Sequence, residues 1–184
     1  MNLRNLNWPL MAVSLVVTLG IMLGMTYVVR QSTESAPLRK FYATHPEVRH
    51  ADIQRDGDRY DITLTLGPVS DFRQAYSALD AGTKAVLKDS KSYKLNIADG
   101  RNQALVDDYY QLHFGLQSGI ATGDFNKMAS DFEARSKALG LDRSKVWVDS
   151  NRLYVQLEGH GGYLYEVLPR LNQPAQTVEG GSAA

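Results

Sequence analysis

Every second residue is apolar in the stretch YDITLTL, which covers residues 60–66. Side chains of a strand alternate between the two faces of a sheet, so this period of two predicts a strand with one buried face and one wet face. The Asp56-Gly57 pair just before it is a turn signal of two-residue hairpins. Residues 49–67 therefore predict a β-hairpin.

The same alternation returns near the C-terminus, in SKVWVDSNRLYVQLEG over residues 144–159. Val146 and Val148 are in phase with Leu153, Val155 and Leu157, which predicts a second hairpin with one common apolar face. A further strand is predicted over residues 92–98, SYKLNIA, where apolar residues alternate and an Asp-Gly pair follows.

Apolar residues three or four apart, the spacing of one helix face, predict helices over residues 38–45, 71–87, 102–122 and 125–139. Ser70 or Asp71 is the expected N-cap of the second of these helices. Gly140 stands where a C-terminal cap of the fourth helix is expected. These segments make the chain a mixture of helices and strands.

A fifth, short helix is predicted over residues 164–171, where four apolar residues have helical spacing. It follows EGHGG at residues 158–162, whose glycines are expected to turn the chain from a strand into this helix. A hairpin followed by a helix would then occur twice. The two copies can be overlaid, with Tyr60 on Leu153 and Phe72 on Leu164.

The predicted fold class is α+β, in the order α-β-β-α-β-α-α-β-β-α after an N-terminal transmembrane helix. The α-β-β-α-β part resembles ring-building and KH-like modules of cell-envelope assemblies, in element order only. No sequence motif of these modules occurs, so we assign no family, and element order carries no function. The soluble α+β domain is expected over residues 38–171.

The N-terminal segment has no charged residue between Arg4 and Arg30. Its apolar run over residues 8–29 meets the requirement of about 20 residues for crossing a bilayer, with Trp8 and Tyr27 at its ends. We predict an uncleaved signal anchor in the cell membrane, with the C-terminal domain extracytoplasmic; a cleaved signal peptide is the alternative. Residues 1–7 are then a short tail, 30–37 a linker and 172–184 a disordered tail.

Composition narrows the classes of activity. Twenty basic and twenty acidic residues cancel, which argues against a dedicated nucleic-acid binder, and the chain has no cysteine. No G-x-S-x-G, H-E-x-x-H, Walker or G-x-G-x-x-G motif is present, and HGG at residues 160–162 lacks the serine elbow that an oxyanion loop requires. We therefore predict no enzyme, no cofactor and no metal site.

Two aromatic residues of the second hairpin, Trp147 and Tyr154, are out of phase with its apolar residues. Alternation places them on the opposite face of the sheet, where an exposed pair would form an interaction surface. His160 and Tyr163 could extend that surface. The alternative is that helices cover both faces of the sheet.

These observations predict a membrane-anchored binding or scaffolding domain of the cell envelope that acts by protein–protein association. The partner would be a second copy or another envelope protein, and no nucleic acid is expected. One alternative is an envelope-facing sensor or small-ligand module, with a cleft between the two units lined by His160 and tyrosines. Another is a cytoplasm-facing KH-like nucleic-acid binder, suggested by the G-x-x-G spacing of residues 159–162.

Overall fold

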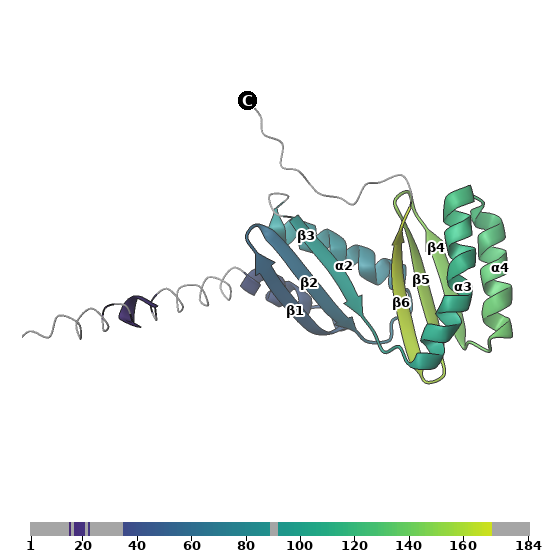
Figure 1. Ribbon diagram of the computed structural model, residues 1–184, viewed down its shortest axis with the longest axis horizontal. Coiled ribbons are helices and arrows are strands. Elements are labelled where there is room, and N and C mark those ends of the chain that lie inside the picture. Colours follow the sequence, from purple (N-terminus) through teal and green to yellow (C-terminus); the bar gives the residue numbers. More distant parts are fainter. Residues whose placement is uncertain (1–14, 16, 21, 23–34, 89–91, 171–184) are drawn as a thin grey trace, which may run out of the picture.

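The computed structural model of this chain describes residues 15, 17–20, 22, 35–88 and 92–170. After a helical segment at 35–43, the strands and helices form two three-stranded sheets (Figure 1). The elements are β1 Val48–Asp56, β2 Arg59–Leu66, α2 Phe72–Leu87, β3 Ser92–Ala98, α3 Gln103–Thr122, α4 Phe125–Ala138, β4 Arg143–Val148, β5 Arg152–Gly159 and β6 Gly162–Pro169.

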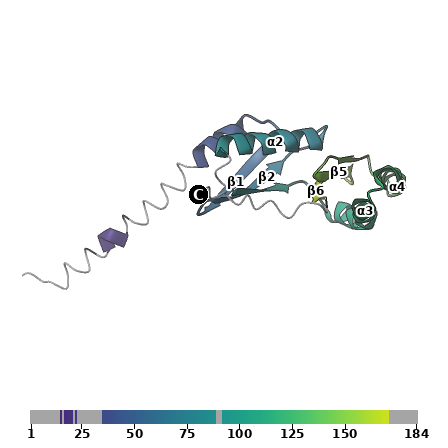
Figure 2. The same ribbon diagram turned by 90° about the horizontal axis from the view of Figure 1, so that it is seen from above.

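The first sheet has the order β1-β2-β3, and one of its faces is covered. β1 and β2 are antiparallel around the turn at Gly57, whereas β2 and β3 are parallel and connected by α2. Figure 2 shows α2 lying along one side of this sheet. Tyr60, Ile62 and Leu64 of β2 are fully buried on that side, while Arg59 and Asp61 are exposed on the other. The alternation predicted for β2 is confirmed.

Helix α2 begins where its N-cap was expected. The Asp71 carboxylate accepts a hydrogen bond from the Gln74 backbone N–H at 2.8 Å, which satisfies one of the free donors of the first turn. Gly67 and Pro68, which precede this cap, end strand β2 and separate it from the helix. The helix buries Phe72, Leu79 and Leu87.

The second sheet, β4-β5-β6, is an antiparallel meander. Five consecutive residues of β5, from Leu153 to Leu157, are buried, so both faces of this sheet are covered. One face packs against α3 and α4 in a core that includes Leu112, Leu116 and Phe132. The other face packs against α2 of the first sheet. The second sheet is thus a middle layer between two sets of helices.

Polar side chains of β5 and β6 hold the backbone that leads into α2. The Gln156 amide accepts from Phe72 N–H at 3.0 Å and donates to the Val69 carbonyl at 2.8 Å. The Tyr165 hydroxyl accepts from Val69 N–H at 2.9 Å, and the Tyr163 hydroxyl donates to the Leu66 carbonyl at 3.1 Å. Because backbone groups inside a protein need partners, these bonds fix the two sheets relative to each other.

The predicted order of elements is wrong in its last member, and this changes the fold class. Residues 162–169 form the strand β6 instead of a helix, and the chain is a mixed α/β domain with two three-stranded sheets. Gly159 pairs with Gly162, and the turn between them consists of His160 at φ 54° and Gly161 at φ 74°. Two positive φ values are typical of a two-residue hairpin turn, so EGHGG reverses the chain into a strand. The overlay of two hairpin–helix units is therefore also wrong.

The predicted transmembrane helix over residues 8–29 lies mostly outside the described residues. Among those that are described, no helix is both long and apolar enough to cross a bilayer. This contradicts the prediction of a single-pass, signal-anchored membrane protein with an extracytoplasmic domain, and that localisation is corrected.

Only some of the predicted segments outside the α+β domain include residues that the structure describes. Residues 35–37, predicted as part of a linker, belong to the helical segment at 35–43. The predicted tails at residues 1–7 and 172–184 lie outside the described residues.

Candidate interaction surface

The structure places Tyr154 in the core and Trp147 at its margin. Both lie on the face of the second sheet opposite Leu153, as the alternation predicts, but α2 covers that face. Tyr154 is 2 % exposed, and its ring lies 5.8 Å from that of Tyr76. Trp147 is half-buried, with the Arg73 guanidinium 6.0 Å from the ring centre. Of the two alternatives, the covered sheet is the one found.

His160 and Tyr163 lie at the other end of β5 from Trp147, near the hairpin turn. Tyr163 is half-buried in the joint between the two sheets. His160 is exposed at the turn, where its Nε2 lies 2.9 Å from a carboxylate oxygen of Asp108. The four predicted surface residues therefore do not form one exposed surface.

A different surface carries the exposed apolar side chains. Within residues 35–88 and 92–170, the large hydrophobic side chains that remain exposed all belong to α3: Val106 is 37 %, Tyr110 65 % and Phe114 59 % exposed. Their spacing of four residues places them in one stripe along the helix. The rings of Tyr110 and Phe114 meet edge to face with centroids 5.3 Å apart. We call Val106, Tyr110 and Phe114 the aromatic stripe.

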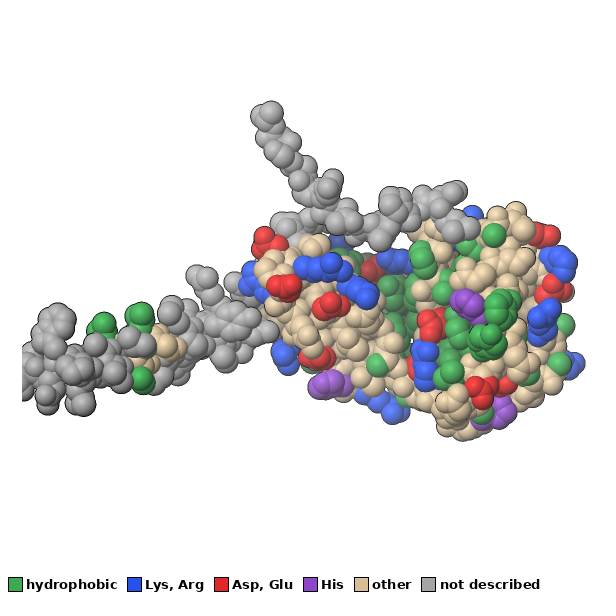
Figure 3. All heavy atoms as spheres, in the orientation of Figure 1, with side chains coloured by type: hydrophobic (Ala, Val, Ile, Leu, Met, Phe, Trp, Pro, Cys, Tyr) green, Lys and Arg blue, Asp and Glu red, His purple; other side chains and the backbone are tan. Residues whose placement is uncertain are grey.

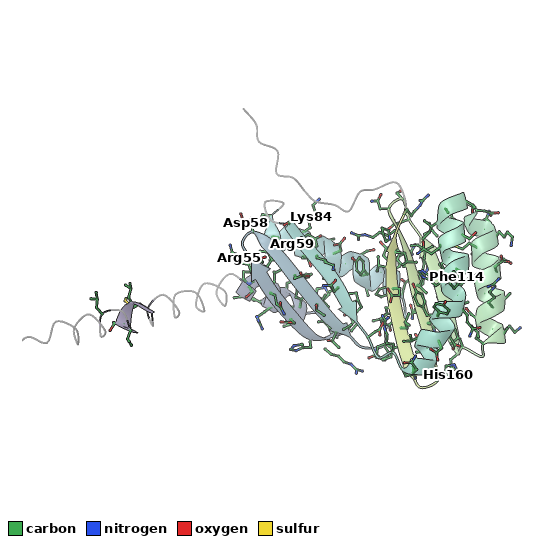
Figure 4. All side chains as sticks on the ribbon, viewed as in Figure 1. Arg55, Asp58, Arg59, Lys84, Phe114 and His160 are labelled. Carbon is green, nitrogen blue, oxygen red and sulfur yellow. The ribbon has the colours of Figure 1, made fainter. Side chains whose placement is uncertain are left out.

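The figures show the same surface. Hydrophobic side chains gather over α3 in Figure 3, on the side of the molecule away from the first sheet. Figure 4 labels Phe114 on this helix. The chain has no Asp, Glu, Lys or Arg between Asp108 and Asp124, so the stripe continues into an uncharged surface. Aromatic enrichment without charge is the composition typical of the centre of protein–protein interfaces.

The helix that carries the stripe is firmly held on its inner side. Leu105, Leu112 and Leu116 are at most 2 % exposed and pack on the second sheet. At Gly119, an added Cβ would lie 2.5 Å from Met128, so only glycine allows α4 to approach this closely. The inner face is thus closely packed, while the outer face has no cover among the described residues.

Two contacts fasten the first turns of α3 to the turn at His160. The Asn102 side chain caps the helix by accepting from Leu105 N–H at 3.0 Å, and its amide nitrogen donates to the His160 carbonyl at 2.8 Å. Asp108, six residues after Asn102, bonds the His160 ring. His160 therefore positions the end of α3 on which the aromatic stripe begins.

A partly buried polar cluster around Asp80 connects helix α2 to both sheets. The Asp80 carboxylate bonds the Arg152 guanidinium at 2.7 Å and the Tyr93 hydroxyl at 2.8 Å, which connects α2 with β5 and β3. Burial raises the pKa of Tyr93 above its ordinary value, and that of Tyr76 to about 12. These phenols stay protonated at neutral pH and serve as hydrogen-bonding and packing groups.

Two surface hollows of the described residues lie away from the predicted ligand cleft. One lies at the β1–β2 turn and is lined by Gln54, Arg55, Asp56, Arg59 and Asp61. Figure 4 labels Arg55 and Arg59 at this end of the first sheet. Another is an open depression beside the start of α2. Neither is lined by His160 or by a tyrosine. In the described part of the chain, no three His, Asp or Glu side chains come together in a way that could hold a metal ion.

In comparisons with protein-family models, curated proteins and solved structures, none matches this chain. The surface must therefore be interpreted from its own chemistry.

Proposed function

We propose that this chain is a protein-binding domain that associates through the outer face of α3. The observation that carries the proposal is the confinement of exposed large hydrophobic side chains, within residues 35–88 and 92–170, to the aromatic stripe. The proposal retains association as the function but moves the surface from the second sheet to α3. It includes no confinement to a membrane.

The energetic argument rests on the two rings. Tyr110 is 65 % and Phe114 59 % exposed. Covering these rings would remove roughly 250 Å² of apolar surface from water, worth about 6 kcal/mol before the entropic cost of association. Rigid aromatic side chains lose little conformational freedom on binding, which is why such residues dominate interface energetics. A rigid helix that presents two of them is suited to partner recognition.

The chemistry of the face selects a protein partner over a nucleic acid. A nucleic-acid surface needs Lys or Arg to neutralise phosphates, and α3 contains neither. The KH-like alternative rested on the G-x-x-G spacing of residues 159–162. These residues form the turn of a hairpin between β5 and β6.

The test is site-specific photo-crosslinking in cells that produce the full chain. A photoreactive residue at Gln117, exposed on the outer face of α3, should give a protein adduct. The matched control carries it at Glu133, which is exposed on α4, and should give none. The double substitution Tyr110→Ser with Phe114→Ser should abolish the adduct at Gln117.

The outcome is read from the adduct and its mass. No adduct at Gln117, or equal adducts at Gln117 and Glu133, would overturn the proposed function. An adduct that survives the double substitution would overturn it as well.

A further inference from the structure

We infer that the partner is a second copy of this chain, with α3 packed antiparallel against α3 of the other copy across a two-fold axis. The inference rests on the proposed function and names the partner for the same surface. It follows from the order of side chains along the helix, from the position of charge and from the charge of the whole chain.

Large and small side chains are distributed unequally along the outer face of α3. Val106 and Tyr110 of the aromatic stripe lie in its first half, Phe114 lies near its middle, and small exposed residues follow near its end: Ser118, Ala121 and Thr122. An antiparallel pair places the bulky half of each helix on the small half of the other. Helices can then approach to the 8–10 Å that close packing requires. A parallel pair would set ring against ring along half of its length.

The two-fold axis lies near Phe114 in this arrangement. Tyr110 then faces Ser118 and Ala121 of the second copy, and the reverse contact forms on the other side of the axis. Each surface is complementary to itself, which is the condition for a closed dimer instead of an open chain of copies.

Charge favours the same direction. Asp107 is exposed beside the aromatic stripe, near the N-terminal edge of the uncharged surface. In a parallel pair, the two Asp107 carboxylates would lie side by side and repel. In an antiparallel pair centred at Phe114, they are separated by about 20 Å along the helices, given a rise of about 1.5 Å per residue.

The whole chain also permits self-association. Its formal net charge is zero with a pI near 6.9, so two copies do not repel at long range near neutral pH. A stable interface buries about 800 Å² on each partner, more than the aromatic stripe alone supplies. The dimer should therefore depend on protein concentration near neutral pH.

The first experiment measures the mass of the purified full chain by sedimentation at increasing concentration. The wild type should move from one chain toward two, whereas Phe114→Ser should stay at one. Ala121→Trp should also stay at one chain, because it fills the small half with bulk although it adds apolar surface. Glu133→Ser on α4 is the control and should dimerise like the wild type. Circular dichroism confirms that each variant is folded.

The second experiment tests direction and uses the absence of cysteine from the chain. Gln117→Cys lies about 9 Å along the helix from its counterpart in the antiparallel pair, and Gln103→Cys about 33 Å. A short bifunctional thiol reagent should therefore link the first variant and leave the second unlinked. Equal linking of both variants would indicate a parallel pair and overturn the proposed direction.

Failure of the inference is distinguishable from failure of the proposed function. A wild type that stays at one chain at every concentration overturns the self-partner. The same holds if Ala121→Trp dimerises normally. If photo-crosslinking at Gln117 still gives an adduct heavier by something other than this chain, the protein-binding function stands with another partner.

Discussion

The two sheets have the same number of strands but differ in how they are covered. In the first sheet, burial alternates along β2 and one face is left to polar residues. In the second sheet, burial is continuous over Leu153 to Leu157 of β5, because α2 covers one face while α3 and α4 cover the other. A strand's pattern of burial thus depends on what packs on it as well as on its own sequence.

The difference also explains where apolar surface remains. The open face of the first sheet is polar, with Arg59 and Asp61 in water, and needs no further layer. The second sheet is enclosed, and the helix outside it exposes Tyr110 and Phe114. The enclosed unit is therefore the one with a surface that further association would cover.

The largest effect should come from truncating the enclosed strand. Leu157 is fully buried in the core between the second sheet and its helices. We expect Leu157→Ala to lower the free energy of unfolding by about 3 kcal/mol, through lost apolar burial and a cavity. The counterpart Thr63→Ala, on the open face of β2, should change it by less than about 0.5 kcal/mol. Urea unfolding followed by circular dichroism measures both, and equal losses would contradict the comparison.

A smaller loss of stability should follow from removing the Gln156 hydrogen bonds that connect the second sheet to the segment before α2. Gln156→Ala leaves the Phe72 N–H and the Val69 carbonyl without their partners inside the protein. We expect a loss of about 2 kcal/mol in the free energy of unfolding. Gln54→Ala on the exposed side of β1 is the matched control and should have little effect. If Gln156→Ala lowers the free energy of unfolding no more than this control does, the contact between the two sheets does not depend on Gln156.

Acid should weaken the second hairpin through Asp149. Burial raises the pKa of this carboxyl, but hydrogen bonds from Asn151 N–H, the Tyr154 hydroxyl and Arg152 N–H outweigh burial and bring the pKa below its ordinary value of 3.8. A lowered folded pKa gives stability that is fully present above the unfolded value and is lost as pH falls through the folded value. Stability measured from pH 5 to pH 2 should fall less steeply in Asp149→Asn. Identical slopes for the variant and the wild type would refute this contribution.

The smallest effect on stability should come from the aromatic stripe. Tyr110→Ser and Phe114→Ser remove side chains that are mostly in water, so the free energy of unfolding of the monomer should change by about 0.5 kcal/mol or less. Thermal unfolding at low concentration measures this. A large loss would show that the stripe supports the fold and would weaken its assignment to a partner.

Much of the fold was predictable because it is encoded by local signals. The turn at Gly57, the cap at Asp71 and the break at Gly123 lie where the sequence places them, since each depends on a few neighbouring residues. Strand β6 was not predictable in this way. Leu164, Val167 and Leu168 fit helical spacing. The adjacent residues Leu164 and Tyr165 are both buried, so β6 lacks the clean alternation that indicates a strand.

The candidate surface on α3 was not predicted from the sequence. The alternation of residues gave the correct sheet face for Tyr154, but it could not show that α2 packs on this face. Phe72 and Tyr76, which contact Tyr154, belong to a helix far from it in the sequence. The aromatic stripe was missed although two signals point to it. Tyr110 and Phe114 lie off the apolar face of α3, and no charged residue follows Asp108 until Asp124.

By itself, the sequence determined where most helices and strands begin and end, because turns, caps and hydrophobic periods act over a few residues. Only the tertiary structure decided that residues 162–169 pair as a strand, that α2 covers the second face of that sheet, and that the outer face of α3 stays exposed. These outcomes depend on packing between segments far apart in the chain. The free energy of burial is shared among such segments and cannot be assigned to one of them in advance.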